Sequence, residues 1–266
     1  DYALADSYIS INQALEHAGA AADVGVDTTW IDSKQFEKDK TKLNDLKDYH
    51  GIIIPGGFGS SGVKGKINAI KFARESDMPF LGLCYGLQLA VVEAARNIGM
   101  GSAHTTEVDA KTKYPVIDIL PAQKQILQRN LYGGSMRLGA YAAVLENSRV
   151  LDLYKRSRLA KDKKRIARLA ADKSQLFRLG ILNKARNVIL ERHRHRYEVN
   201  PKFIKPLEKA LFFPGYHIRT DKTKLIEFIE MPKHRFFVGS QAHPEFKSRL
   251  SYPAPLFLGF VEACGM

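Results

Sequence analysis

Cysteine is scarce in this sequence. The chain of 266 residues has two cysteines, Cys84 and Cys264, and no Asn-x-Ser/Thr glycosylation signal. Two cysteines are too few for a disulfide scaffold or a four-ligand zinc site, and no hydrophobic run has the length of a membrane span. These absences exclude a disulfide-rich secreted protein and favour a protein of the reducing cytoplasm without membrane association.

Acidic residues are few relative to basic ones, with 28 Asp/Glu against 41 Lys/Arg and a net charge of +13. Residues 151–188 alone hold 12 Lys/Arg and 3 Asp, so the excess is local. Leu159, Ile166, Leu169 and Leu176 recur there at helical spacing, which predicts an amphipathic basic helix. Such a segment is either a solvated charged hairpin or a docking surface for another subunit, an acidic partner or RNA.

One of the two cysteines lies between a strand and a helix. Residues 80–83 are an apolar run typical of a buried strand, and residues 88–96 have a helical pattern. Between them, Gly-Leu-Cys-Tyr-Gly has the spacing of a nucleophile elbow around Cys84. The glycines permit a tight turn, and the helix N-terminus favours a thiolate. A lone cysteine is often only a small buried side chain, but this setting favours a nucleophile.

A cysteine nucleophile needs a base, and the base needs a group that orients it. Residues 235–241 read as a strand, and His243-Pro-Glu follows directly. A histidine just beyond a strand end lies at the rim of the sheet where the elbow also opens. Glu245 can turn back to accept a hydrogen bond from the imidazole. The pattern therefore predicts a triad of Cys84, His243 and Glu245.

A glycine loop after the strand at 51–54 contains G-x-G-x-x-G at 57–62, the dinucleotide-binding spacing. We reject that interpretation because the next strand ends in Cys84 and not in an acidic residue. In nucleophile-elbow proteins one oxyanion donor is the N–H after the nucleophile, here Tyr85, and the other comes from a neighbouring strand-to-helix loop. The backbone N–H of Gly57 suits that second role.

Together these motifs resemble the glutamine amidotransferase domain of the CTP synthase family. The glycine loop, the cysteine elbow and His-Pro-Glu are shared with class I glutamine amidotransferases generally, whereas two longer strings point to CTP synthases. The similarity covers about residues 6–261, interrupted at roughly 151–188, where the chain is longer than the family. The motifs are Pro-Gly-Gly-Phe-Gly at 55–59, Leu-Gly-Leu-Cys-Tyr-Gly-Leu-Gln at 81–88, Glu-Arg-His-Arg-His-Arg-Tyr-Glu-Val-Asn at 191–200 and His-Pro-Glu-Phe-Lys-Ser-Arg at 243–249.

The resemblance implies a glutaminase reaction. Cys84 attacks the side-chain amide of L-glutamine, His243 protonates the departing ammonia and then activates water, and Glu245 orients His243. The backbone N–H groups of Gly57 and Tyr85 hold the oxyanion.

The resemblance also implies which residues bind the amino-acid end of glutamine, namely Gly57, Gln88, Glu107 and Arg196. A carboxylate suits an α-amino group, and a cation suits an α-carboxylate. The run of arginine and histidine at 192–196 could also suggest a nucleic-acid patch. Its alternation before a strand-like Tyr-Glu-Val predicts a rigid loop instead, so nucleic acid is not an expected partner.

Partners and cofactors are expected outside these residues. The family has an N-terminal synthetase domain that binds ATP, Mg²⁺ and UTP, and it assembles as a tetramer; this chain is expected to hold no cofactor or metal of its own. The resemblance implies that the first strand of the family's domain precedes these residues, and we expect it to be missing from this chain. Ser61 stands where the family has arginine, and Lys64 where it usually has glutamate, in a loop linked to activation by GTP. We therefore expect a weak response to GTP or none.

The order of elements predicts one α/β domain over residues 1–266, with a basic, partly helical insertion at about 151–188. This alternation predicts a mostly parallel sheet with helices on both faces, which is the class I glutamine amidotransferase (flavodoxin-like) architecture. The site is expected at the carboxyl ends of the strands. The remaining alternatives are another class I amidotransferase, a γ-glutamyl hydrolase, or a non-catalytic binding module that uses the insertion. The expected strands lie at about 51–54, 79–83, 115–119 and 236–241, and the expected helices at about 7–19, 64–75, 85–98 and 255–264.

Overall fold

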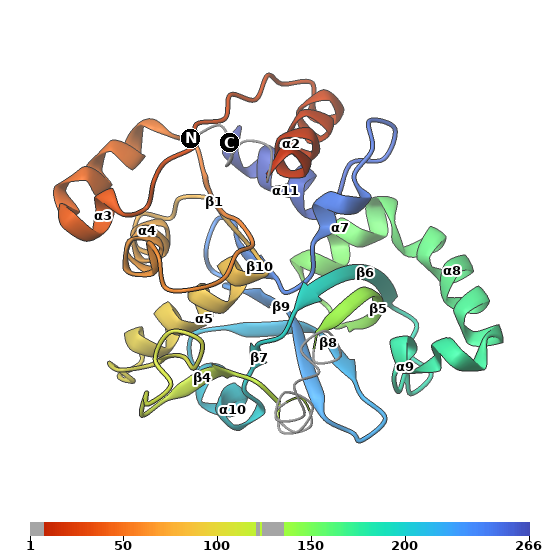
Figure 1. Ribbon diagram of the computed structural model, residues 1–266. Helices are drawn as coiled ribbons and strands as arrows, with labels where there is room; N and C mark the ends of the chain where they lie inside the picture. Colours follow the sequence, from red (N-terminus) through yellow and green to blue (C-terminus); the bar gives the residue numbers. More distant parts are fainter. Residues whose placement is uncertain (1–7, 121–122, 124–135) are drawn as a thin grey trace.

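The computed structural model describes residues 8–120, 123 and 136–266. Its centre is a curled, mixed sheet of seven strands in the order β1-β2-β10-β9-β8-β5-β6 (Figure 1). Neighbouring strands pair in parallel only from β1 to β2 and from β2 to β10. The strands are β1 (Ile52–Ile54), β2 (Phe80–Leu83), β5 (Arg137–Leu145), β6 (Val188–His195), β8 (Phe212–Ile218), β9 (Lys224–Glu230) and β10 (Phe237–Ser240).

The α/β class is confirmed, but the expectation of a mostly parallel sheet is wrong. The four pairings from β10 through β9, β8 and β5 to β6 are antiparallel. A short turn joins β8 to β9. Strands β5 and β6 pair along the whole length of β6, from Arg137 opposite His195 to Val144 opposite Val188. The hydrophobic pattern predicted no strand in these segments. A parallel strand is usually preceded by a crossover helix that the sequence pattern can indicate, whereas an antiparallel strand can follow a short turn and gives no such signal.

Helices cover both faces of the parallel part of the sheet (Figure 1). Phe80 packs with the helices of one face, and Leu81 and Leu83 pack with those of the other, as the two-residue period of a strand requires. The first face carries α4 (Val63–Glu75) and α5 (Tyr85–Asn97), and the second carries α2 (Ile9–Ala22), α7 (Arg149–Ser157) and α11 (Pro255–Cys264). The expected helices are confirmed within a few residues; the start expected at residue 7 lies outside the described residues.

A second, smaller sheet has three short strands, β3 (His104–Thr105), β4 (Pro115–Asp118) and β7 (Glu198–Val199). The strand expected at about 115–119 is therefore present, but it lies outside the main sheet. Two single-turn helices, α3 (Gln35–Lys38) and α10 (Ile204–Leu207), pack into the same hydrophobic core as α4 and α5. 3₁₀ helices at Lys40–Asp48 and Pro201–Phe203 adjoin them. None of the described helices combines the length and the apolarity needed to cross a membrane.

The basic insertion is mostly helical and connects β5 to β6. It contains α7, α8 (Leu159–Ala171), a 3₁₀ turn at Lys173–Gln175 and α9 (Leu176–Leu179). Ile166 and Leu169 turn inward to pack against Val188 and Leu190 of β6. The exposed positions of α8 carry most of its lysine and arginine residues, so the helix is amphipathic as its spacing predicts.

The run at 192–196, expected to be a rigid loop, is a continuation of strand β6 through His195. His193 and His195 are buried, whereas Arg192 and Arg194 are exposed. The alternation of histidine and arginine is thus the two-residue period of a half-buried strand, and the expectation of a loop is wrong.

Candidate active site

The elbow around Cys84 is a tight turn, as its sequence predicts, and its backbone is strained. Cys84 lies between β2 and α5 with φ 50° and ψ −98°, a conformation unusual for a residue with a side chain. A Cβ atom at Gly86 would lie 2.1 Å from the carbonyl oxygen of Ile54, so only glycine fits there. The amide of Cys84 donates to the carbonyl of Ser240 at 2.6 Å, which ties the elbow to the end of β10.

His243 and Glu245 follow β10 and lie in contact with each other. The Nδ1 of His243 and the Oε1 of Glu245 are 2.7 Å apart, and both side chains are buried. The ring of Phe246 stacks on the imidazole, with centroids 5.0 Å apart and planes 13° apart. The backbone N–H of His243 donates to the carbonyl of Arg192 on β6 at 2.8 Å. The histidine is therefore held through its backbone, its ring face and its Nδ1.

His243 and Cys84 meet at Gly56. A Cβ atom at Gly56 would lie 2.7 Å from the Cε1 of His243 and 3.6 Å from the Cβ of Cys84. Burial lowers the pKa of His243, but hydrogen bonds to Cys84 and Glu245 and the charges of both groups raise it to about 10. The imidazole is therefore protonated near neutral pH, beside a thiol and a carboxylate. The three residues of the expected triad lie together in the structure.

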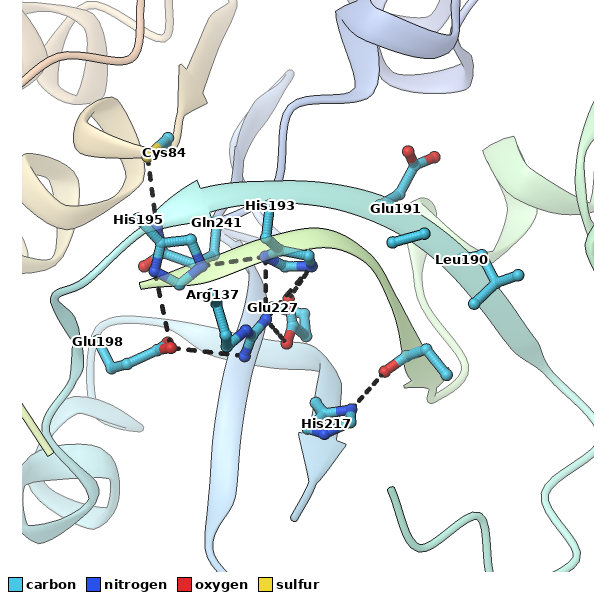
Figure 2. Close-up of polar contacts among 12 residues, drawn as sticks. Cys84, Arg137, Leu190, Glu191, His193, His195, Glu198, His217, Glu227 and Gln241 are labelled. Atoms are coloured by element: carbon cyan, nitrogen blue, oxygen red, sulfur yellow. Dashed lines mark hydrogen bonds and ion pairs between the residues drawn. The ribbon is translucent and has the colours of Figure 1, made fainter. Parts of the chain in front are cut away.

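Gln241 is a neighbour of Cys84 that the sequence analysis missed. Its Nε2 lies 3.7 Å from the Sγ of Cys84 (Figure 2), and its backbone N–H donates to the carbonyl of Glu227 at 2.9 Å. The Oε1 of Gln241 in turn accepts from the Nε2 of Gln88 at 3.3 Å. A polar residue at the buried end of a strand, two positions before His243, was the available signal.

The glycine loop lies against the start of α5. A Cβ atom at Gly57 would lie 3.7 Å from the Cδ1 of Tyr85, and the hydroxyl of Tyr85 donates to the carbonyl of Gly59 at 2.6 Å. Gly57 is exposed, whereas Tyr85 is buried at the first position of α5, where backbone N–H groups have no partner within the helix. Gly57 thus lies beside the ring of Tyr85, the residue that directly follows Cys84.

Of the residues expected to bind glutamine, Glu107 contacts this loop, whereas Gln88 and Arg196 lie near Tyr197. The Oε1 of Glu107 accepts from the backbone N–H of Gly59 at 3.0 Å. Burial raises the pKa of Tyr197, Glu107 raises it further and Arg196 opposes the rise, so both charged groups lie near this tyrosine. Gln88 is buried and donates to the carbonyl of Tyr197 at 3.0 Å. Glu107 thus borders the loop and Arg196 lies beside Tyr197, whereas the amide of Gln88 is engaged by the protein itself.

A buried charged network lies beneath Gln241. Its histidines and Glu198 belong to the string at 191–200, whereas Arg137 and Glu227 lie in no motif. Arg137 bonds Glu227 at 2.5 Å and His193 at 2.9 Å, and it lies 3.5 Å from Glu198, as Figure 2 shows. Burial raises the pKa of Glu198 to about 7 and that of Glu227 to about 8 against the opposing charge of Arg137. Burial also lowers the pKa of His193 and of His195 well below the usual range, with Arg137 adding to both shifts.

The network is a hydrogen-bonded support for the site. The Nδ1 of His193 and the Nε2 of His195 are 3.0 Å apart, and the Nδ1 of His195 faces the carbonyl of Tyr197 at 3.0 Å. It thus connects β5, β6 and β9 to the loop beside Gln88. Within the part of the chain that the structure describes, no group of three or more His, Cys, Asp or Glu side chains is arranged to hold a metal ion.

The cysteine elbow, the His–Glu pair at the end of the neighbouring strand and the α/β fold define a class I glutamine amidotransferase. In agreement, residues 3–263 match the family model described as glutamine amidotransferase class-I, and the chain belongs to this family.

Within the family the chain is similar to CTP synthases. It is 44% identical over 263 residues to the CTP synthase of Methanopyrus kandleri and 45% identical over 268 residues to that of Methanocaldococcus jannaschii. Each match covers 98% of this chain and 43% of the relative, so the chain spans less than half the length of these curated relatives.

A solved structure shows which part of those relatives the chain represents. The glutaminase domain of Trypanosoma brucei CTP synthase with bound acivicin superimposes with a TM-score of 0.80 at 32% identity, covering 98% of this chain and 88% of that one. The chain accordingly corresponds to the glutaminase domain of CTP synthases. A putative GMP synthase subunit from Thermoplasma acidophilum, with a TM-score of 0.51 and 12% identity, shares the fold over 92% of this chain and 85% of that one.

Proposed function

We propose that this chain hydrolyses L-glutamine to glutamate and ammonia through a thioester on Cys84. The observation that carries the proposal is the convergence of a strained cysteine elbow with a buried His243–Glu245 pair 2.7 Å apart, packed around Gly56. Nucleophile, base and orienting carboxylate are the three parts that acyl transfer to a thiol needs.

The reaction follows from these positions. In the reactive state the thiol proton of Cys84 lies on His243, and the thiolate attacks the side-chain carbonyl carbon of glutamine. The backbone N–H groups of Gly57 and Tyr85 donate to the oxyanion that forms. His243 returns the proton to the leaving nitrogen, so that ammonia departs and a γ-glutamyl thioester remains. His243 then takes a proton from water, the hydroxide attacks the thioester, and glutamate and the free thiol are released.

The amino-acid end of glutamine binds between the glycine loop and the end of β6. Glu107 supports the backbone of Gly59 and offers its second carboxylate oxygen to the α-amino group. Arg196 supplies the positive charge for the α-carboxylate. Because the amide of Gln88 already bonds Tyr197 and Gln241, we assign to Gln88 the shaping of the pocket floor through those two contacts.

The ammonia serves a synthetase domain that aminates UTP to CTP and consumes ATP with Mg²⁺, all bound outside the described residues. This part of the proposal rests on the CTP synthase relatives, whose length is more than twice that of this chain. We further propose a homo-oligomer, a tetramer in the full-length protein, located in the cytoplasm.

The test is ammonia release from glutamine by the variants Cys84→Ala and Cys264→Ala. Cys84→Ala is expected to lower the rate by several orders of magnitude, because the alanine cannot form the thioester. Burial raises the pKa of Cys264 to about 12, so that thiol is not a nucleophile near neutral pH, and Cys264→Ala is the matched control with unchanged activity. Glutamine hydrolysis that survives in Cys84→Ala would overturn the proposal.

A further inference from the structure

The outer edge of β6 is the starting point. Among the described strands of the main sheet, β6 is the last and pairs with β5. The backbone of Leu190 on the other side is satisfied by side chains: its N–H donates to the Oδ2 of Asp162 at 3.0 Å, and its carbonyl accepts from the Nζ of Lys247. The carbonyl of Arg192, two residues on, accepts from the backbone of His243. The edge strand thus holds both the insertion and the segment that carries the triad.

Asp162, an acidic residue within the basic insertion, is fully buried. It lies in the first turn of α8, and its Oδ2 is 3.5 Å from the Nζ of Lys247. The Nζ of Lys247 is also 3.5 Å from the Oε2 of Glu191, whose other oxygen accepts from the hydroxyl of Tyr154 at 2.9 Å. Burial raises the pKa of Glu191, and Lys247 opposes the rise. Removing one member of such a buried ion pair leaves the other charge uncompensated.

Arg158, at the junction of α7 and α8, holds the same segment by its backbone. It is buried, and its Nη2 donates to the carbonyl of Lys247 and lies 3.5 Å from that of Tyr252. The guanidinium also lies 5.4 Å from the centre of the Tyr252 ring, and the hydroxyl of Tyr252 donates to the carbonyl of Ser157 at 3.4 Å. The junction therefore contacts both ends of residues 247–252, which directly follow the triad.

We propose that the α7–α8 junction positions the catalytic histidine and glutamate, with Asp162 and Arg158 as positioning residues that act through Lys247. Lys247 closes the 3₁₀ turn Pro244–Lys247 that contains Glu245, and the amide of Ser248 donates to the carbonyl of Glu245 at 3.1 Å. Fixing Lys247 therefore fixes the turn that sets the distance from Glu245 to His243. The inference rests on the proposed glutaminase function and assigns the insertion a part in it.

The variant Asp162→Asn tests the ion pair at nearly constant volume. Its amide oxygen can still accept from Leu190, so the variant removes only the charge, which faces Lys247 at 3.5 Å and the exposed Arg165 at 3.9 Å. We expect kcat for glutamine hydrolysis to fall about 10- to 100-fold with little change in KM, since small displacements of reacting groups cost about that much. Lys164→Ala, an exposed change on the same helix, is the matched control and is expected to keep the wild-type kcat.

A second readout separates positioning from stability. The rate at which iodoacetamide alkylates Cys84 as a function of pH reports the Cys84–His243 pair and needs no glutamine. Asp162→Asn is expected to shift this profile, because Lys247 then keeps Glu191 as a carboxylate partner but loses the contact with α8 that helps to fix the turn containing Glu245. A lowered melting temperature with unchanged kcat and an unchanged alkylation profile would overturn the proposal.

Arg158→Lys keeps the proposal testable if Asp162→Asn does not fold. The lysine keeps the charge but loses the planar fork that reaches two carbonyls, so kcat is expected to fall in this variant too, whereas a wild-type kcat would overturn the proposal. Absence of ammonia release from the wild-type protein would instead count against the proposed function, and the alkylation profile would still decide the positioning role.

Discussion

At the scale of single residues, the chemistry depends on the proton shared around His243. Its imidazole lies between a thiol and a carboxylate, and both partners raise its pKa to about 10 against the effect of burial. The pairing therefore gives the site a proton donor for departing ammonia at neutral pH, where a free imidazole would be mostly neutral.

The Glu245→Gln variant tests this arrangement. An amide can still contact Nδ1 but carries no charge, so we expect kcat to fall about 10²- to 10⁴-fold with a smaller effect on KM, because an orienting group contributes mainly to the transition state. The NMR titration midpoint of the His243 imidazole is expected near pH 10 in the wild type and lower in Glu245→Gln. A full kcat in Glu245→Gln would mean that the site works as a dyad.

The same shift predicts how stability depends on pH. Because the pKa of His243 is higher in the folded protein than in the unfolded chain, its contribution to the free energy of unfolding is complete below about pH 6.5. That contribution is lost as the pH rises toward about 10. The difference in unfolding free energy between wild type and His243→Asn should therefore shrink over this interval, and a difference that grows with pH would contradict the assignment.

At the scale of elements, two strand ends and one loop build the site. β2 ends in the elbow, β10 ends in the His–Glu turn, and β1 leads into the glycine loop between them. These three parallel strands are neighbours, so their carboxyl ends meet at one edge of the sheet. Motifs spread over some 190 residues of sequence thereby come within contact distance.

Gly56 is the point where these three elements touch. A methyl group there would lie 2.7 Å from the Cε1 of His243, so Gly56→Ala must displace the imidazole or the loop. We expect kcat to fall at least about 100-fold, with a loss of about 1–3 kcal/mol in the free energy of unfolding, as for other overpacked sites. Gly25→Ala, where a Cβ meets no atom within 4 Å, is the control for the loss of a glycine. Unchanged kcat in Gly56→Ala would mean that the loop moves freely away from His243.

The parallel half of the sheet and the triad could be predicted from sequence because each is marked locally. Glycines flank Cys84, and His243 and Glu245 are two residues apart just after an apolar strand. The antiparallel half carries no such marks, since β5 and β6 are separated by the whole insertion and pair only through tertiary contacts. The burial of Arg137 was hidden for the same reason, because its partners come from strands distant in sequence.

Other expectations were wrong where one pattern has two interpretations. The alternation of arginine and histidine at 192–196 was interpreted as a loop, although a two-residue period with one buried face is a strand. In the insertion, the excess of positive charge hides the importance of Asp162. A single acidic residue on a basic helix gives no sign in the sequence that it is the buried one.

At the scale of the whole molecule, the chain corresponds to one part of its relatives, which are CTP synthases of more than twice its length. In the proposed function, CTP formation uses residues beyond those described. The lysine and arginine side chains of α8 are exposed, whereas Asp162 of the same helix is buried. The positive charge of this helix therefore lies on an outer surface of the molecule.

The response to GTP is also a property of the whole molecule. Ser61 in the loop after β1 and Lys64 in the first turn of α4 are exposed. The resemblance to CTP synthases implies arginine and usually glutamate at these positions, so we expect residue 61 to lack a bidentate cationic donor. We expect GTP to activate glutamine hydrolysis weakly or not at all, and any effect to fade between low and moderate salt. A titration of GTP against ammonia release at the two salt concentrations measures this. Saturable, guanine-specific activation at moderate salt would show that other residues bind the nucleotide.

The central claim is that Cys84 carries the acyl group, and peptide mapping by mass spectrometry after acid quench tests it most directly. The protein is mixed with glutamine, quenched during turnover and digested, and a parallel sample is treated with a glutamine-analogue electrophile. The account predicts one γ-glutamyl adduct, and one analogue adduct, both on the peptide that contains Cys84 and absent from Cys84→Ala. Ammonia release without any adduct, or an adduct on the peptide that contains Cys264, would contradict it.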